Sequence, residues 1–259
     1  MDLTQDVAVV TGASAGLGRA LSIELAHRGM RVVGFGRRAD ALDETARLAG
    51  PRFSSVVVDV SDIDAVTTAM ATVSRDIGFV ALLINNAAVY PRLDFLDETP
   101  HTFMSTVAIN LGGMVACSHA ALQHMVQRGH GRIVNVSTFA DLAPIPSSSG
   151  YAVSKGAARI FTRALVADIC DRFPDIVIND WIPGALATDM GIADGLDPRI
   201  AAAWGAELSL WHNRSLTGTL WAGDTEHLAP RSFKRRLLDA ALRRSPVPRR
   251  LVPGASAAP

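Results

Sequence analysis

Cysteine is scarce in this sequence. Its 259 residues include two cysteines, Cys117 and Cys170. These two cysteines do not form the CxxC spacing that a thiolate metal site or a redox dithiol needs. Both lie in apolar, helix-like surroundings. We therefore predict two buried thiols, as in a protein of the reducing cytoplasm, and no metal site.

An excess of charge of one sign is also missing. The chain has 25 basic and 25 acidic residues, which gives a formal net charge of +0. This balance does not indicate nucleic acid, an anionic membrane surface or an acidic partner. The function must therefore come from a local site.

Long apolar runs and a basic leader are the third absence. The chain begins MDLTQDVAVVTG, with acidic residues where a signal peptide is basic, and no apolar run approaches the roughly 20 residues of a membrane span. No internal repeat recurs at a fixed period. Because 259 residues suffice for one sizeable core but not for two comfortable domains, we expect a single-domain cytoplasmic protein.

What is present is an alternation of Val/Ile-rich runs with amphipathic segments. This pattern predicts an α/β fold with a doubly wound parallel sheet. The predicted strands are Val7–Thr11, Arg31–Phe35, Ser55–Asp59, Ala81–Asn85, Gly131–Ser137, Ile176–Ile182 and Gly218–Trp221. The predicted helices are Gly18–His27, Ala39–Leu48, Ile63–Ile77, the long region Pro100–Gln127, and Tyr151–Phe173.

The first strand is followed by a glycine-rich loop, TGASAGLG. Its spacing is Gly12-x-x-x-Gly16-x-Gly18, with Thr11 in front. Glycines between a strand and a helix permit a tight turn and let backbone amides approach a pyrophosphate at the positive end of the helix. Alone, the loop is equally compatible with a purely structural turn.

Six further motifs accompany this loop in a fixed order. They are DVSD at Asp59–Asp62, NNAA at Asn85–Ala88, INLGG around Asn110, GRIVNVST at Gly131–Thr138, YAVSK at Tyr151–Lys155 and IPGALAT at Ile182–Thr188. In these seven motifs the chain resembles the classical short-chain dehydrogenase/reductase family, from its N-terminus to about Asp224. The resemblance implies a Rossmann-type domain over residues 1–230 and a nicotinamide cofactor. The residues that it implies for cofactor binding are Gly12, Ser14, Gly16, Leu17, Gly18, Arg37, Arg38, Asp59, Val60, Asn86, Ala87, Ala88, Tyr151, Lys155, Pro183, Gly184 and Thr188, with Ile182 beside the carboxamide.

Tyr151 and Lys155 lie four residues apart, which places them on one face of a helix. A neighbouring ammonium favours the ionised phenol, so we expect Lys155 to lower the pKa of Tyr151 from about 10 toward neutrality. The resemblance implies that Tyr151 is the general acid and that Lys155 also binds the ribose. An exposed tyrosine and lysine on a solvated helix is the alternative for an isolated pair.

The position of the family's catalytic serine aligns with Thr138, and Ser137 precedes it. A threonine hydroxyl can donate to an oxygen on which negative charge grows, although its methyl group narrows the pocket. Because adjacent strand residues face opposite sides, we expect one hydroxyl to act, with Thr138 preferred and Ser137 as the alternative. For Asn110, the resemblance implies a water that links Lys155 to solvent; a structural amide is the alternative.

Cofactor choice depends on the end of the second strand, which reads VVGFGRR. The position of an acidic residue that would bind the ribose 2′-hydroxyl is Gly36, and Arg37 and Arg38 follow, as suits a 2′-phosphate. NADP(H) is therefore favoured over NAD(H), although Ala15 stands where many NADP-preferring relatives have a basic residue. In NNAA, Ala88 replaces a glycine and would be strained if φ were positive there.

The segment after the sixth strand, residues 186–212, is expected to be a substrate lid. Its apolar stripe either lines the pocket or faces the core: Leu196, Ile200, Trp204, Leu208, Leu210 and Trp211. We expect a bulky or hydrophobic carbonyl substrate. The segment Ser232–Arg244 is predicted to be a basic helix, solvated or packed on a partner, and Pro246–Pro259 is predicted to be disordered.

The sequence therefore predicts an NADP(H)-dependent ketone reductase that acts as a homodimer, with a tetramer as the alternative assembly. Tyr151, Lys155, Thr138 and Asn110 form the expected catalytic set. Two other functions remain open: a redox-neutral epimerase or dehydratase on the same fold, and a nucleotide-sensing binding protein. A carrier-protein-tethered substrate is a minor alternative for the basic C-terminal segment, and nucleic acid has no aromatic or motif support.

Overall fold

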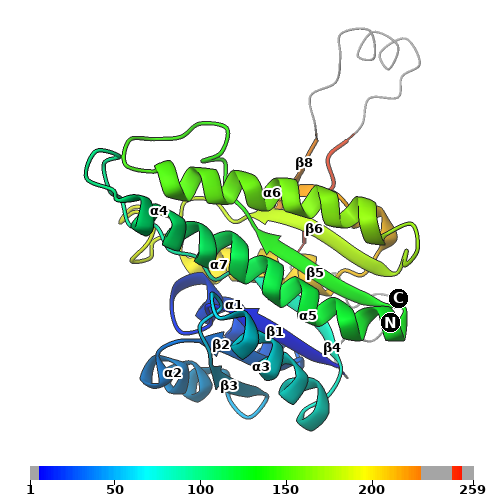
Figure 1. Cartoon of the computed structure of the whole chain (residues 1–259). Coiled ribbons are helices and arrows are strands. Elements are labelled where there is room, and N and C mark those ends of the chain that lie inside the picture. Colours follow the sequence, from blue (N-terminus) through cyan, green and yellow to red (C-terminus); the bar gives the residue numbers. More distant parts are fainter. Residues whose placement is uncertain (1–5, 229–246, 253–259) are drawn as a thin grey trace, which may run out of the picture.

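The computed structural model describes residues 6–228 and 247–252 of the chain. In this part, eight strands form one sheet in the order β3-β2-β1-β4-β5-β6-β7-β8, with β8 antiparallel to β7 and all other neighbours parallel (Figure 1). The strands are β1 (Val7–Thr11), β2 (Arg31–Gly36), β3 (Phe53–Val57), β4 (Val80–Asn85), β5 (Gly131–Val136), β6 (Ile176–Ile182), β7 (Leu220–Ala222) and β8 (Thr225–His227).

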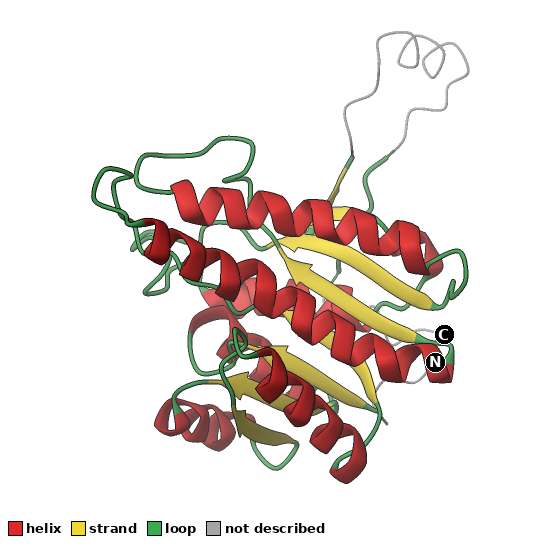
Figure 2. Ribbon diagram, in the orientation of Figure 1, coloured by secondary structure: helices red, strands yellow, loops and turns green. Residues whose placement is uncertain are grey.

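Helices cover both faces of this sheet (Figure 2). They are α1 (Gly16–His27), α2 (Ala39–Ala49), α3 (Ile63–Asp76), α4 (Pro100–Val107), the π-helical turn η2 (Ala108–Gly112), α5 (Gly113–Arg128), α6 (Ser149–Ile169), α7 (Pro198–Leu210) and the 3₁₀ turn η3 (Arg214–Leu216). The doubly wound parallel sheet predicted from the sequence is confirmed.

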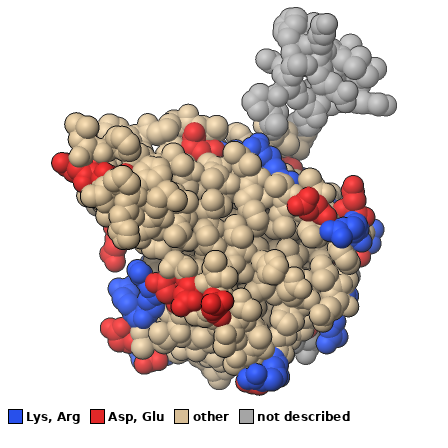
Figure 3. All heavy atoms as spheres, viewed as in Figure 1, with Lys and Arg blue, Asp and Glu red and all other residues tan. Residues whose placement is uncertain are grey.

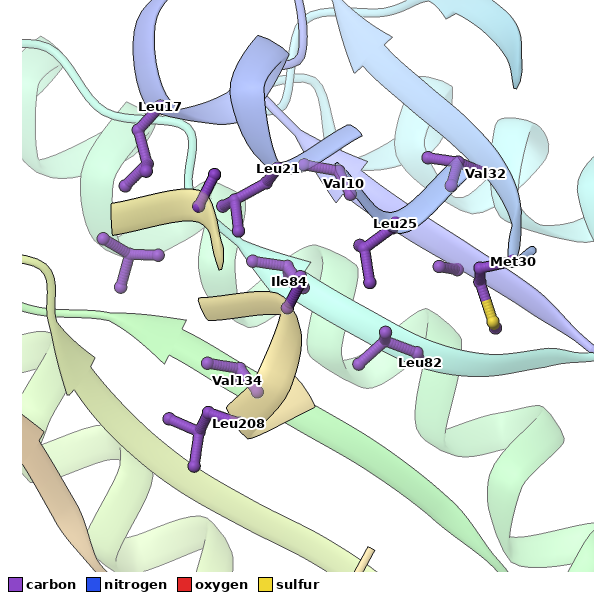
Figure 4. Packing of buried hydrophobic residues seen from close by; sticks show 14 of the residues in the cluster. Val10, Leu17, Leu21, Leu25, Met30, Val32, Leu82, Ile84, Val134 and Leu208 are labelled. Atoms are coloured by element: carbon purple, nitrogen blue, oxygen red, sulfur yellow. The ribbon is translucent and has the colours of Figure 1, made fainter. Parts of the chain in front are cut away.

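The core consists of two apolar layers separated by the sheet. Alternate residues of the central strand β1 face opposite layers, with Val10 in one and Val9 in the other. Both are fully buried, as in a parallel strand that is covered on both sides. Figure 4 shows Leu21 and Leu25 of α1 packed in the first layer with Ile84 of β4. Burying both faces leaves the carboxyl ends of the strands as the place for a site.

The predicted long helical region around residue 110 is two α-helices joined by the π turn η2. The run Pro100–Arg128 has the length and hydropathy of a membrane span. The expectation that no apolar segment is long enough to approach such a span was therefore wrong. More than half of that apolar window is buried in the protein. Cys117, Ala121 and Met125 of α5 have no exposed surface and pack against the sheet, as in a core helix.

Most of the predicted lid belongs to the core instead. Residues 198–210 form α7, which lies against α1 on the sheet, and Gly205 of α7 leaves room for the ring of Trp181. Leu208 has no exposed surface, and Ile200, which is about half exposed, does not line the cleft. Of the two readings of the apolar stripe, the core face is therefore the right one. Only the loop before α7 remains near the predicted cofactor site.

The carboxyl-terminal part of the sheet differs from the prediction in two respects. An antiparallel strand, β8, follows β7 and was not predicted. Residues 247–252, expected to be disordered, are bound to this edge, where Leu251 is 4% exposed and Arg249 forms an ion pair of 2.8 Å with Glu226. Apolar burial and a paired arginine hold this short segment, which composition alone did not reveal. The helix predicted over residues 232–244 lies outside the described residues.

Candidate active site

One cleft at the carboxyl ends of the strands contains nearly all the predicted site residues. Of the candidates, Asn110 alone does not line it. The predicted residues that line it are Gly12, Ser14, Gly16, Leu17, Gly18, Arg37, Arg38, Asp59, Val60, Asn86, Ala87, Ala88, Ser137, Thr138, Tyr151, Lys155, Ile182, Pro183, Gly184 and Thr188. The tertiary structure thus brings together motifs that are up to 176 positions apart, from Gly12 to Thr188.

The glycine-rich loop forms the floor of one end of the cleft. Gly12 has φ +70°, and a Cβ on Gly18 would lie 2.2 Å from the carbonyl oxygen of Gly12, so neither position tolerates a side chain. The hydroxyl of Thr11 accepts hydrogen bonds of 2.9 Å from the backbone amides of Asn86 and Ala87. These bonds tie the loop after β1 to the loop after β4. They give the threonine in front of the glycines a structural role.

The first turn of α1 is open to an anion. Its N-cap residue, Ala15, makes no side-chain cap hydrogen bond, and the turn carries no acidic residue. The first amides of a helix lack intrahelical partners and attract negative charge. Arg19 of α1 steadies the loop through hydrogen bonds to the carbonyls of Ser14 and Ala41, at 2.8 and 3.1 Å. This end of the cleft fits the pyrophosphate of a dinucleotide.

Two arginines follow β2 at the same end. Arg37 forms an exposed ion pair of 3.5 Å with Asp59, and Arg38 is exposed at the start of α2. Partial burial acts to raise the pKa of the Asp59 carboxyl, but hydrogen bonds from Ser61 and the charge of Arg37 hold it below its usual value. Asp59 is therefore a carboxylate at neutral pH, and it neutralises part of the charge of Arg37.

Tyr151 and Lys155 occupy adjacent turns of α6 and face the other end of the cleft. Lys155 is almost fully buried and donates a hydrogen bond of 2.9 Å to the carbonyl of Val136, at the end of β5. Burial lowers the pKa of Lys155 to about 8, while the charge of Asp180 acts in the opposite direction. The two residues are thus placed in one site rather than on a solvated face.

The pKa of Tyr151 differs from the sequence prediction. Burial raises it above the ordinary value, and the hydrogen bond with Thr138 acts to lower it. The nearby ring of Tyr90 raises it further. The expected lowering of the pKa of Tyr151 is therefore wrong for this arrangement, because burial has the largest effect and outweighs the groups that favour the phenolate.

The two neighbouring hydroxyls lie beyond the last residue of β5, so both can face the cleft. Strand β5 was predicted to include Ser137 but ends at Val136. The hydroxyl of Thr138 lies near enough to the phenol of Tyr151 to act on its pKa, and it accepts a hydrogen bond of 3.2 Å from the amide of Ala140. The hydroxyl of Ser137 is buried and has no hydrogen-bond partner among the described residues. The contact with Tyr151 favours Thr138 as the working hydroxyl.

Asn110 lies in the π turn, behind the cleft. Its side-chain oxygen accepts a bond of 2.7 Å from the amide of Val89, and its amide nitrogen donates to the carbonyl of Val89 and to Ser154 at 3.0 Å. The hydroxyl of Ser154 in turn donates to the carbonyl of Tyr151 at 2.8 Å. These bonds favour the structural reading of the amide, because they fix the loop after β4 against the start of α6.

Sequence reasoning missed Tyr90 and Arg92, which cover the catalytic end of the cleft. The ring of Tyr90 stacks on that of Tyr151, with centroids 4.6 Å apart, and the guanidinium of Arg92 lies over Tyr90 at 5.2 Å. Arg92 also donates hydrogen bonds to the carbonyls of Met190 and Gly191, at 2.8 and 2.5 Å. It thereby joins the loop after β4 to the loop before α7. The aromatic and cationic residues of VYPR, directly after NNAA, were the available signal.

Apolar side chains form the rim at this end. Phe139, Ile145, Met190 and Ile192 line the cleft and are all partly or largely exposed. Ala88 does not have a positive φ, so the replacement of a glycine in NNAA introduces no strain there.

Comparisons with known proteins agree with this geometry. A family model described as short chain dehydrogenase matches residues 6–197. The chain is 33% identical to gluconate 5-dehydrogenase of Gluconobacter oxydans, over 71% of this chain and 72% of the relative. It is 34% identical to the L-tagatose-forming galactitol 2-dehydrogenase of Cereibacter sphaeroides, over 76% and 78%. A short chain dehydrogenase structure from Bacillus anthracis superimposes with a TM-score of 0.78 at 23% identity, covering 85% of this chain and 95% of that one.

Proposed function

Because the chain belongs to the short-chain dehydrogenase/reductase family, whose members oxidise alcohols or reduce ketones with NAD(P), we propose that it is an NADP(H)-dependent reductase of a bulky, largely apolar ketone. The observation that carries this proposal is the arrangement of Tyr151, Thr138 and Lys155 at the apolar end of the cleft.

In the proposed reaction, Tyr151 donates its phenolic proton to the substrate oxygen as negative charge develops there. The hydroxyl of Thr138 donates a second hydrogen bond to the same oxygen. A nicotinamide cofactor held in the cleft would supply the hydride. The positive charge of Lys155, buried one helical turn from Tyr151, stabilises the phenolate that remains. The raised pKa of Tyr151 keeps the phenol protonated near neutral pH, which suits the reductive direction.

The preference for NADP(H) is supported by the charges at the end of β2. Neither Gly36 nor the two residues after it is acidic, and Arg37 and Arg38 both line the cleft. The ion pair between Arg37 and Asp59 is exposed, and such a pair contributes only about 0–1 kcal/mol to stability. Little free energy is therefore lost if Arg37 leaves Asp59 to bind a 2′-phosphate. A guanidinium binds a phosphate more strongly, through parallel hydrogen bonds.

The bulky, apolar substrate is supported by the rim formed by Phe139, Ile145, Met190 and Ile192. In the described part of the chain, Arg92 and the short loop before α7 border this end of the cleft, while α7 itself belongs to the core. A substrate larger than a simple sugar alcohol can therefore rest against the apolar rim while its ketone reaches Tyr151.

We propose that the protein acts as a homodimer in the cytoplasm. The face formed by α4, α5 and α6 carries few charged side chains (Figure 3). Met104, Val153 and Ile160 are all more than half exposed on these helices. An apolar face of this kind is typical of a subunit interface. A tetramer remains the alternative assembly.

The proposal is tested by following absorbance of NADPH and of NADH against a panel of bulky ketones. We expect consumption of NADPH and much slower consumption of NADH. In Arg37→Ala the KM for NADPH should rise about 10- to 100-fold, since a hydrogen bond to a charged group contributes about 1.5–3 kcal/mol, and the KM for NADH should change little. Arg47→Ala, an exposed arginine paired with Glu44 on α2, is the matched control.

Two results would contradict the proposal. One is equal or better use of NADH by the wild-type protein, which would remove the cofactor preference. The other is turnover with no net consumption of cofactor, which would indicate a redox-neutral reaction. Tyr151→Phe identifies background activity, because it keeps the ring and removes the proton donor.

A further inference from the structure

A row of polar side chains crosses the sheet directly behind the proposed catalytic residues. Asn85 of β4 pairs in register with Asn135 of β5, which pairs with Asp180 of β6, so the three side chains lie on one face at the carboxyl ends of adjacent strands. Asn85 donates to Asn135 at 2.8 Å, and Asn135 donates to the hydroxyl of Thr162 on α6 at 2.9 Å. Asp180 is the last residue of this row, and it is the ionisable one of the three.

Asp180 is an unusual residue for its position. It is 7% exposed, and together with Asn179 it interrupts the apolar sequence of the buried strand β6. Thr162 donates a hydrogen bond of 2.8 Å to its Oδ1. Burial raises the pKa of Asp180 to about 7, although Thr162 and the positive charges on α6 act to lower it. Burying a carboxylate costs free energy of folding unless an opposite charge is nearby. A positive charge close to Asp180 is therefore expected.

The charged groups that act on Asp180 are all on α6. They are Arg159, Lys155 and Arg163. Arg159 is already bound to Asp141 at 2.7 Å, and Arg163 is exposed to solvent. The residues paired with Asp180 on the flanking strands, Asn135 on β5 and Leu220 on β7, do not titrate.

Lys155 is the complementary case. It is 2% exposed, and among the described residues its ammonium donates a hydrogen bond to the carbonyl of Val136, which is a neutral acceptor. Val136 adjoins Asn135, the register partner of Asp180, so the ammonium and the carboxylate approach the same end of β5 from α6 and β6. Each is a buried charge that the other can offset.

We propose that Asp180 is the buried counter-ion of Lys155, a positioning residue that keeps the ammonium charged while Tyr151 gives up its proton. This inference rests on the proposed role of Lys155 in the reaction. Asp180 does not line the cleft, so it would act through Lys155. Without the carboxylate, Lys155 would keep its burial and its neutral acceptor but lose the attraction that favours its charged form.

The chain allows a direct test, because it contains two lysines, Lys155 and Lys234. Labelling lysine with ¹³C at the ε carbon gives two NMR signals, and Lys234→Arg leaves that of Lys155. Titration of this protein without cofactor or substrate reports the pKa of Lys155. In Asp180→Asn, which preserves the shape and can still accept from Thr162, we expect that pKa to fall by about one.

The matched control is Asp141→Asn. It removes a carboxylate that also acts on α6, but one paired with Arg159. We expect the pKa of Lys155 to change by less than about 0.3 in this variant, since a more distant charge is screened. An unchanged pKa of Lys155 in Asp180→Asn, or an equal fall in both variants, would overturn the assignment.

If Asp180→Asn does not fold, Thr162→Val tests the same point with the carboxylate in place. Removing the hydrogen bond to Asp180 makes its ionised form less stable, so the pKa of Lys155 should fall, by less than in Asp180→Asn. No fall would overturn the assignment.

Activity then separates this inference from the function on which it rests. If the pKa of Lys155 falls from about 8 to about 7, its charged fraction at pH 8 falls from one half to about one tenth, and kcat should fall about 5-fold, with little change at pH 6. A fall in the pKa of Lys155 without this change in the pH profile would support the counter-ion and refute the catalytic role of Lys155. An unchanged pKa would refute the counter-ion alone.

Discussion

The two adjacent hydroxyls after β5 should respond to removal in opposite ways. The hydroxyl of Thr138 acts to lower the pKa of Tyr151, whereas the hydroxyl of Ser137 is buried with no partner among the described residues. Thr138→Val keeps the volume and shape of the side chain and removes its donor. Ser137→Ala removes the unpaired hydroxyl and leaves a methyl group.

The size of each effect follows from these contacts. Losing one donor to a developing oxyanion costs about 10²–10³ in kcat, or about 2.7–4 kcal/mol. Thr138→Val also leaves the amide of Ala140 without its acceptor, which should lower the free energy of unfolding by about 1 kcal/mol. Ser137→Ala removes a buried polar group that has no partner in the described part of the chain, so stability should be equal or up to about 1 kcal/mol higher, and kcat should change less than about threefold.

The assay measures kcat for the best ketone and the Tm of each variant. Thr138→Ser should restore most of the activity, because it returns the donor, and Tyr151→Phe sets the floor. A loss of activity in Ser137→Ala as large as that in Thr138→Val would refute the reasoning. In that case the unpaired hydroxyl of Ser137 would be the donor to the substrate.

Three further predictions concern the loop, the thiols and the carboxyl-terminal edge. Gly18→Ala should weaken NADPH binding at least about 10-fold in a fluorescence titration, because its Cβ would meet a backbone carbonyl at 2.2 Å, whereas Gly112→Ala, with nothing within 4 Å, should not. Iodoacetamide at pH 8 should modify the half-buried Cys170 before Cys117, as followed by mass spectrometry. Burial raises the pKa of the Cys117 thiol to about 12, and the reactive thiolate forms only as the pH approaches that value. Faster modification of Cys117 would contradict this. Arg249→Ala should lower the free energy of unfolding by about 1–3 kcal/mol in urea, and an unchanged midpoint would show that this edge does not contribute to stability.

The prediction of the sheet succeeded where local sequence patterns are strong. Strands such as Val7–Thr11 and Ile176–Ile182 have the predicted bounds, because continuous apolar runs between turns are typical of buried parallel strands. The assignment of residues 198–210 to a lid was wrong, because an apolar stripe on a helix looks the same whether it covers a pocket or a core. The packing of Leu251 against the sheet depended on contacts with distant residues.

The candidate site was predictable to the extent that it consists of motifs. The cleft brings together the glycine loop, Asn86, Tyr151 and Lys155, each of which the sequence had marked. Tyr90 was not marked, since its stacking on Tyr151 joins two loops whose geometry no local pattern encodes.

The sequence by itself determined the alternation of strands and helices along most of the chain, the place of the glycine loop between β1 and α1, and the position of Tyr151 and Lys155 one turn apart on a helix. These follow from residue type and spacing along the chain, which act over a few residues. The tertiary structure alone decided which hydroxyl acts on the pKa of Tyr151, in which direction that pKa moves, and that the charge of Asp180 acts on Lys155. Burial and electrostatic interaction depend on neighbours contributed by other strands and helices, and these neighbours are set only when the sheet and its two layers have assembled.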